Sequence, residues 1–315
     1  MDGSTPTLGL VVDYFAGLGG FTLGASMAGA SVVAAINHWR LAVDTHARNH
    51  PGVRHECEDL TRYDPARLPP FDVLVASPAC QGHARARGVA SGSSGDARWD
   101  SSRATAWSVV DTLEVCRPRA LVVENVPDFA RWSLFGVWCE ALTRLGYAPR
   151  VQVCDAAEWG VPQHRPRVIV TALRGKAAPP VPSPVRAPRG IGWVIRWEEG
   201  VWTPVAAKVE ATRARVANGR ARFGERFVMP YNGSGSGLTG RDLSRPIGTI
   251  TAADRWAVVR GDSMRMLLVD ELRHAMGFPD GYVVPASRAD ATKMLGNAIV
   301  PAVAASAVRA VMEAA

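Results

Sequence analysis

The chain has 315 residues, of which 47% are hydrophobic and 21% are charged. This length suits one large domain or two smaller ones, and the composition is that of a globular protein rather than a disordered or collagen-like one. No apolar run approaches the length of a membrane span, and the N-terminus lacks the basic region and cleavage site of a signal peptide, so we expect a cytoplasmic protein.

The first half of the chain alternates between short apolar runs and helix-like stretches. Strands are predicted at 8–15, 31–37, 71–77, 120–126 and 167–173, and helices up to residue 28 and at 40–50, 105–116, 134–146 and the C-terminus. This alternation predicts an α/β fold with a doubly wound, mostly parallel sheet, which binds ligands at the carboxyl ends of its strands. The glycines 17–20, Cys80 and Glu124 fall at such ends.

Residues 174–245 differ from the rest of the chain: they are rich in proline, glycine, tryptophan and arginine. The segment holds 13 Lys or Arg against 5 Asp or Glu, a net +8, while the whole chain carries +7. We therefore predict one domain made of 1–173 and 246–315 and a small basic domain at 174–245 that faces a polyanion. A solvated arginine-rich surface is the alternative explanation.

The turn DYFAGLGGFTLG (13–24) would let a nucleotide-like ligand approach the backbone closely. It is not a P-loop, and Thr22 stands where a dinucleotide-binding motif has its third glycine. Trp39 after the second strand and Asp59 are placed to stack on an adenine and to bind its amino group. Taken alone, packing in the core explains Trp39 equally well, and capping of a helix explains Asp59 equally well.

Cys80 in SPACQGHARARG is a candidate nucleophile, because the arginines that follow it would favour a thiolate. Glu124 would protonate or bind a base heteroatom, although a strand-end ion pair explains it as well. Arg165 and Arg167 in VPQHRPR are two residues apart, which predicts that they point to the same side.

The other cysteines and the histidines have simpler explanations. The five cysteines are odd in number and form no CxxC pair, which predicts neither disulfides nor zinc. Cys116, Cys139 and Cys154 are expected to be buried apolar side chains. His46 and His50 are four residues apart on a helix, and we expect solvated residues there rather than a metal site.

Six blocks in order, DYFAGLGGF, SPACQGH, VVENVPDF, VPQHRPRV, RPIGTIT and LGNAIVPAVA, resemble the DNA cytosine-5 methyltransferase family over almost the whole chain. The resemblance implies a class I, Rossmann-like methyltransferase fold, with residues 174–245 as the target-recognition domain. It implies transfer of a methyl group from S-adenosylmethionine to C5 of a flipped-out cytosine in a short specific sequence of double-stranded DNA, with S-adenosylhomocysteine as product. No metal and no membrane are implied. A restriction endonuclease is the implied companion, and a monomer on DNA the implied assembly.

The resemblance also assigns residues. Cys80 would add to cytosine C6, Glu124 would hold N3 and the amino group, and Arg165 would contact O2. The cofactor would be held by Phe15, Ala16, Gly17, Leu18, Gly19, Gly20, His38, Trp39, Asp59, Leu60, Pro78, Asn297 and Ala298. DNA would be contacted by Gln81, Gly82, Arg85, Arg87, Asn125, Gln163, Arg167, Arg241 and Thr249. Residues 87–103 are rich in glycine and serine, a composition that suits a closing loop, with a disordered connector as the alternative.

Two positions depart from the family pattern. Ala79 stands where the family usually has the proline that precedes the nucleophile, and His38 stands at the usual ribose-binding glutamate. Two alternatives stay open: the same fold acting on RNA or with a modified cofactor, and a non-catalytic DNA-binding relative. The sequence also leaves the target DNA sequence open.

Overall fold

The computed structural model describes residues 9–79, 105–184, 187–231 and 240–315. The chain forms two compact units. Unit 1 comprises Met1–Cys154, Pro166–Ser183 and Ile299–Ala315, and unit 2 comprises Asp155–Arg165 and Pro184–Ala298. Each is described by itself.

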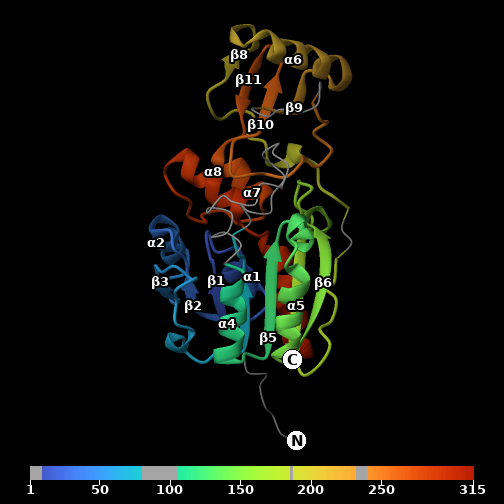
Figure 1. Cartoon of the computed structure of the whole chain (residues 1–315). Coiled ribbons are helices and arrows are strands. Elements are labelled where there is room, and N and C mark those ends of the chain that lie inside the picture. Colours follow the sequence, from blue (N-terminus) through green and yellow to red (C-terminus); the bar gives the residue numbers. More distant parts are fainter. Residues whose placement is uncertain (1–8, 80–104, 185–186, 232–239) are drawn as a thin grey trace, which may run out of the picture. The chain divides into compact units, whose positions relative to one another are not determined.

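Unit 1 is built around a seven-stranded sheet with the order β3-β2-β1-β4-β5-β7-β6 (Figure 1). Its strands are β1 (Leu10–Tyr14), β2 (Ser31–Ile36), β3 (Arg54–Glu56), β4 (Val73–Ala76), β5 (Ala120–Asn125), β6 (Tyr147–Asp155) and β7 (Pro166–Arg174). The pairs from β3 to β5 are parallel, and β7 runs antiparallel to β5. This mostly parallel sheet confirms the predicted fold class, and the five predicted strands are all present.

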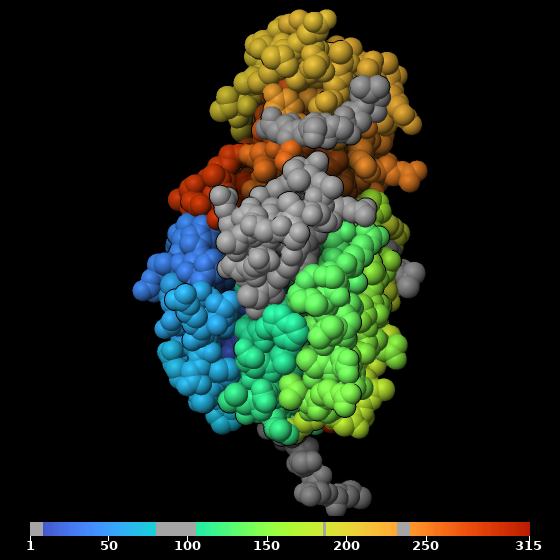
Figure 2. All heavy atoms as spheres, in the orientation of Figure 1, coloured from blue at the N-terminus to red at the C-terminus, as the bar shows by residue number. Residues whose placement is uncertain are grey.

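Helices cover both faces of this sheet. They are α1 (Gly20–Met27), α2 (Arg40–Asn49), α4 (Trp107–Cys116), α5 (Phe135–Arg144) and α9 (Pro301–Ala314), with short 3-10 turns η1 (Pro65–Arg67) and η2 (Pro127–Arg131). Helices α4 and α5 pack side by side over one face, where they form a continuous layer (Figures 1 and 2). Helices α1 and α9 pack against each other, and α9 also contacts β5 and β7. The central strands are therefore shielded from water, and all of β5 is buried.

The C-terminal helices also pass a simple test for a membrane span. By length and composition alone, the stretch Arg288–Ala314 would be long and apolar enough to cross a bilayer. However, 78% of its apolar window is buried inside the protein, which is typical of the core helices of a folded domain.

Unit 2 contains a four-stranded antiparallel sheet with the order β8-β11-β10-β9. Its elements are β8 (Thr203–Pro204), β9 (Arg226–Pro230), β10 (Trp256–Arg260), β11 (Ser263–Met266), α6 (Glu210–Phe223), α7 (Val269–Ala275), α8 (Arg288–Asn297), η3 (Ala156–Trp159), η4 (Ile191–Val194) and η5 (Val205–Ala207). Helix α6 packs on β9 through an apolar cluster that includes Val216 and Phe227. Hydrophobic side chains from α6 and from the sheet thus give this unit its own core.

The boundary predicted between residues 245 and 246 falls inside this sheet. Strand β9 lies before the boundary and β10 after it, yet the two are hydrogen-bonded neighbours. The compact unit therefore extends beyond the basic segment, because the later strands complete its sheet. The division into a catalytic and a recognition domain is a functional assignment, and it stays a prediction.

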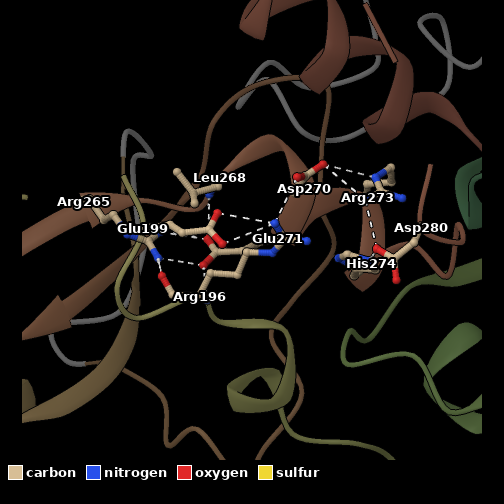
Figure 3. A network of polar contacts seen from close by, with 9 residues as sticks. All are labelled: Arg196, Glu199, Arg265, Leu268, Asp270, Glu271, Arg273, His274 and Asp280. Atoms are coloured by element: carbon tan, nitrogen blue, oxygen red, sulfur yellow. Dashed lines mark hydrogen bonds and ion pairs between the residues drawn. The ribbon is translucent and has the colours of Figure 1, made fainter. Parts of the chain in front are cut away.

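A buried ion pair anchors α7 to β11 in unit 2 (Figure 3). The Glu271 carboxylate accepts two hydrogen bonds from the Arg265 guanidinium, at 2.7 and 2.8 Å, and the two side chains are 0% and 3% exposed. The backbone amides of Arg196 and Leu268 also donate to Glu271, at 2.7 Å each. Each oxygen of the Glu271 carboxylate therefore accepts two hydrogen bonds, which offset the cost of burying its charge. The network is structural and holds the unit together.

Candidate active site

The carboxyl ends of β4 and β5 lie side by side because these strands are parallel neighbours. Glu124 near the end of β5 accepts a hydrogen bond of 3.2 Å from the Ser77 hydroxyl just after β4. The Asn125 side-chain amide donates to the Pro78 carbonyl at 3.1 Å. These contacts fix the backbone that leads to position 80. Cys80 itself, the predicted DNA contacts Gln81, Gly82, Arg85 and Arg87, and the predicted closing loop lie outside the described residues.

Glu124 is 4% exposed, and its other oxygen forms an ion pair of 2.9 Å with Arg167 Nε. Arg167 lies near the start of β7, the antiparallel neighbour of β5. A buried carboxylate requires charged or hydrogen-bonding partners, and Arg167 and Ser77 supply them from two different strands. The ion pair considered for Glu124 from sequence is therefore present, and it also holds the carboxylate beside the segment that leads to Cys80.

Arg165 and Gln163 belong to unit 2, where they are 1% and 0% exposed. The Arg165 guanidinium donates to the backbone carbonyls of Ile250, Gly296 and Ala298 at 2.7 to 2.8 Å. The Gln163 side-chain oxygen accepts from the Ile250 amide at 3.1 Å. Both side chains therefore clamp backbone segments of their own unit.

The two arginines of VPQHRPR, which their spacing predicts to point to the same side, have partners in different units. Arg165 binds carbonyls in unit 2, whereas Arg167 pairs with Glu124 in unit 1. The period-2 rule holds for one regular strand, but β7 begins only at Pro166, between the two arginines. Arg167 is therefore the arginine of the motif that contacts Glu124; a contact between Arg165 and the cytosine stays a prediction.

The turn after β1 contains three residues with positive φ: Phe15 at 60°, Gly17 at 53° and Gly19 at 95°. Glycine adopts this left-handed backbone readily, but for Phe15 it is a strained conformation that the surroundings must hold. A Cβ built on Gly17 would meet nothing closer than the Phe15 carbonyl oxygen, at 3.6 Å. The loop thus leaves open space beside its backbone at the carboxyl end of β1, which fits the close approach of a nucleotide-like cofactor.

Gly20 has a second reason to be glycine. A Cβ at this position would lie 2.3 Å from the Ile299 carbonyl oxygen, and one at Gly24 would lie 2.5 Å from the Ala304 Cβ. The close packing of α1 on the segment that forms α9 therefore explains both glycines. A cofactor contact by Gly20, or by its neighbours Ala16 and Leu18, stays a prediction.

Asn37 organises the segment between β2 and α2. Its side-chain oxygen accepts a hydrogen bond of 2.9 Å from the Trp39 amide, and its backbone carbonyl accepts one of 3.2 Å from the Glu58 amide. These bonds bring Trp39 and the residue before Asp59 to the same backbone position. The sequence prediction that both segments belong to one site is consistent with this arrangement.

The side chains predicted to hold an adenosine are accessible. Trp39 is half-buried, His38 and Asp59 are exposed, and Leu60 is buried. The Asp59 Oδ1 accepts hydrogen bonds from the Thr61 amide and hydroxyl, which hold the pKa of the carboxyl below its ordinary value. The Oδ2 has no hydrogen bond within the described part of the chain, so it is available to an amino group.

Asn297 and Ala298, predicted to close the cofactor pocket, end α8 in unit 2. The Ala298 carbonyl accepts from Arg165 at 2.8 Å. Their contact with a cofactor stays a prediction.

His46 is not the solvated helix residue that its spacing predicted. It is 1% exposed, with its ring 4.7 Å from that of His50 and 4.9 Å from that of His55. The prediction was wrong because β3, only three residues long, covers this face of α2. No cluster of three or more His, Cys, Asp or Glu with the geometry of a metal site occurs in the described residues.

Unit 2 contains a basic pocket of about 820 Å³. Three exposed arginines, Arg222, Arg241 and Arg245, line it together with His164 and Asp242. The Arg241 guanidinium lies 5.8 Å from the centre of the Trp256 ring, and His164 is paired with Asp155 at 2.8 Å. Thr249, another predicted DNA contact, donates to the His164 carbonyl at 2.9 Å. The arginine cluster suits a polyanion.

Sequence reasoning missed two residues at the strand ends. Ser77 binds Glu124, and the Thr105 hydroxyl accepts a hydrogen bond of 3.0 Å from the Ala79 amide. Ser77 was within reach of the sequence, because it immediately follows a predicted strand beside the candidate nucleophile. Thr105 is 26 residues from Ala79 and carried no signal.

Comparisons with known proteins match this chain to methyltransferases. The family model for the C-5 cytosine-specific DNA methylase matches residues 10–189 and 204–313. Type II methyltransferase M.NlaX of Neisseria lactamica is 27% identical over 312 residues, which cover 94% of each protein. Type II methyltransferase M.AgeI of Thalassovita gelatinovora is 32% identical over 192 residues, which cover 56% of this chain but only 43% of that relative. The solved structure of the S. pombe Dnmt2 methyltransferase has a TM-score of 0.67 at 16% identity over 98% of this chain and 99% of its own, and therefore shares the fold.

Proposed function

Because the chain belongs to the C-5 cytosine-specific DNA methylase family, we propose that it methylates C5 of a cytosine within a short specific sequence of double-stranded DNA. The observation that carries the proposal is the buried Glu124 carboxylate at the end of β5, held by Ser77 and Arg167. It stands beside the backbone that leads to Cys80, the residue type needed to attack C6.

Cys80 and Glu124 divide the chemistry between them. The Cys80 thiolate adds to C6, and the electron pair of the C5–C6 double bond moves toward C5 and the ring. Glu124 shares a proton with N3 and so stabilises the charge that develops there. Once C5 carries the new methyl group, a water molecule takes up the C5 proton; the C–H electron pair re-forms the C5–C6 double bond, and the C6–S bond breaks to return the Cys80 thiolate. The target atom is inaccessible inside a duplex, so the base must be flipped out.

Arg167 takes the role that the motif resemblance gave to Arg165. It is bound to Glu124 and orients the carboxylate, and its remaining donors are the proposed contact for the cytosine O2. Arg165 and Gln163 act by clamping backbone in unit 2.

S-adenosylmethionine supplies an electrophilic methyl group when bound. In this proposal the turn of Phe15, Gly17 and Gly19 gives it backbone access, Trp39 stacks on its adenine, and Asp59 accepts from the amino group. His38 replaces the family's usual acidic ribose contact, so Asn37 or a backbone group takes that part. A cytoplasmic location and a companion restriction endonuclease remain expectations of the same proposal.

DNA recognition is assigned to the basic segment 174–245, whose Arg222, Arg241 and Arg245 line one pocket. The Lys and Arg excess of this segment supports a phosphate backbone as the partner.

The function is tested by conversion-based 5-methylcytosine sequencing of DNA from a methylation-free bacterial host. Wild type and Cys80→Ala are expressed in parallel. We expect one short methylated motif with wild type and none with the variant. Equal methylation by the variant would refute Cys80 as nucleophile. No methylation by a folded, DNA-binding wild type would refute the activity.

A further inference from the structure

Asp13 of β1 and Thr22 of α1 stand at the two ends of the glycine turn. The Thr22 hydroxyl lies 2.7 Å from Asp13 Oδ2, and the two residues are 1% and 0% exposed. Their contact therefore closes the turn that contains the strained Phe15. The other Asp13 oxygen is buried and has no hydrogen-bond partner among the described residues.

His46 and His55 extend this contact into a chain. His46 Nε2 lies 3.0 Å from Thr22 Oγ1, and His46 Nδ1 lies 2.7 Å from His55 Nε2. His46 is buried and His55 is half-buried. The chain runs from β3 through α2 and α1 to β1, so it connects the elements next to three of the four segments of unit 1 predicted to hold the cofactor; the fourth, at Pro78 after β4, lies outside it.

A hydrogen-bond chain of this kind has only two arrangements of its protons, because each middle group must donate to one neighbour and accept from the other. In the first, Asp13 donates to Thr22, Thr22 to His46 Nε2, and His46 Nδ1 to His55 Nε2. In the second, every bond is reversed and Asp13 is a carboxylate. The arrangements differ by one proton.

We propose that this chain is a proton relay that carries a solvent proton from His55 to Asp13 and thereby sets how firmly the glycine turn is held for its ligand. His55 takes up a proton on Nδ1 and passes its Nε2 proton to His46 Nδ1. His46 passes its Nε2 proton to Thr22, and Thr22 passes its hydroxyl proton to Asp13. One proton enters and one arrives, and both histidines end neutral with exchanged tautomers.

The titration of the surrounding groups supports Asp13 as the end of the relay. Burial raises the pKa of Asp13 to about 7, against the lowering effect of the Thr22 hydrogen bonds. Burial lowers the pKa of His46 to about 2 and that of His50 to about 4, and it lowers the pKa of His55 as well. Near neutral pH the histidines are therefore uncharged, and the Asp13 carboxyl is the group that changes its charge.

Among the described residues, the two strands that flank β1 add no charge in register with Asp13. Ala35 of β2 and Val75 of β4 are the residues in register with it. From α2 the facing titratable groups are His46 and His50, and from β3 the facing group is His55.

Deprotonation of Asp13 strengthens the hold on the turn. A hydrogen bond from Thr22 to a carboxylate is about twice as strong as one to a neutral group. The negative charge at the foot of the turn also favours a cationic ligand. Affinity for S-adenosylmethionine, which has a net positive charge, therefore rises with pH through neutrality, while affinity for the net-neutral S-adenosylhomocysteine rises less. This step rests on the proposed function, whereas the relay itself does not.

The relay is tested without ligand by ¹⁵N NMR of the histidine rings of the whole chain between pH 5.5 and 8.5. We expect His46 to carry its proton on Nδ1 at low pH and on Nε2 at high pH. In Asp13→Asn the His46 tautomer should stay the same at every pH. In Thr22→Val it should no longer change with the ionisation of Asp13, because the link is lost. Thr22→Ser keeps the hydroxyl and should show the wild-type change. A wild-type His46 with one tautomer across this range would overturn the relay.

The coupling to the ligand is tested by calorimetric titration with each adenosyl compound at pH 6 and pH 8. We expect the S-adenosylmethionine affinity of wild type to rise about tenfold, which lies in the usual range for coupled sites. Asp13→Asn should remove the rise. Binding that is equally pH-dependent in Asp13→Asn would overturn the coupling. If wild type bound neither compound, the proposed function and the coupling would both fail, while the tautomer change would still decide the relay.

Discussion

At the scale of single residues, the Glu124 carboxylate is positioned from two strands at once. Ser77 follows β4 and Arg167 is the second residue of β7, and each contacts one of the Glu124 oxygens. A carboxylate fixed in this way has little freedom to rotate, so its oxygens are held in one orientation. A fixed orientation is what the proposed contact of Glu124 with the edge of a flipped base requires.

Glu124→Gln keeps the shape of the side chain and removes its proton exchange. We expect methyl transfer to fall by about 10²- to 10⁴-fold, the usual contribution of a general acid. The measurement is transfer from tritium-labelled S-adenosylmethionine to DNA. Glu140→Gln is the matched control, because its side chain is 62% exposed on α5. A Glu124→Gln enzyme within a few-fold of wild type would contradict the assignment.

Much of this residue-level picture was available from the sequence, because Glu124 and Asn125 end a predicted strand beside the strand that precedes Cys80. The assignment of roles within VPQHRPR was not. Arg165 and Arg167 are the same residue type in the same motif, and only their partners distinguish them. Such partners depend on distances between segments far apart in sequence, which periodicity does not report.

At the scale of elements, the strongly apolar strands were predictable, and the weakly patterned ones were not. Strand β5 is buried along its whole length, and its apolar run is easily recognised. Strand β3 has three residues and no apolar pattern, and the edge strand β6 mixes exposed and buried positions. The missed β3 is also the reason that His46 was expected to be solvated.

The buried contact between Asp13 of β1 and Thr22 of α1 predicts that the stability of the protein depends on pH. The folded pKa of Asp13 is raised to about 7 from 3.8, so its contribution is fully present below about pH 4 and is lost as pH rises to 7. Three pKa units correspond to about 4 kcal/mol. We expect the free energy of unfolding of Asp13→Asn, relative to wild type, to increase by about this much from pH 4 to pH 8.

Urea denaturation at several pH values measures this difference. His46, whose pKa is lowered to about 2, acts in the opposite sense in both proteins, since acid below about pH 6 favours its unfolded, protonated form. Taking the difference between the two proteins removes this contribution. A difference that does not change with pH would show that Asp13 is ionised throughout.

At the scale of the whole molecule, charge distribution was the most informative property of the sequence. It located the basic segment, but it did not locate the boundary of the compact unit, because β10 and β11 complete a sheet with strands from that segment. Strand pairing across a predicted boundary is invisible to composition.

Three arginines of the basic pocket provide a test of DNA binding. If Arg222, Arg241 and Arg245 neutralise phosphates, replacing all three by alanine should make the salt dependence of affinity shallower, by roughly 0.9 in log–log slope per lost contact. Fluorescence anisotropy with duplex DNA from 50 to 300 mM salt measures the slope. The same replacement at the exposed arginines Arg48, Arg119 and Arg144 of unit 1 is the control. Equal slopes for both triple variants would contradict a basic DNA-binding pocket.

The central claim is that Cys80 attacks C6 of a cytosine while Glu124 holds the ring. The most direct measurement is intact mass spectrometry of the protein with S-adenosylmethionine and a duplex that carries 5-fluorocytosine at the motif found by sequencing. Fluorine at C5 does not leave as a proton does, so Cys80 should remain attached. We predict a mass equal to protein plus methylated strand for wild type and the unmodified protein mass for Cys80→Ser. The same adduct with Cys80→Ser, or methyl transfer by wild type to ordinary DNA without any adduct on the fluorinated duplex, would contradict the account.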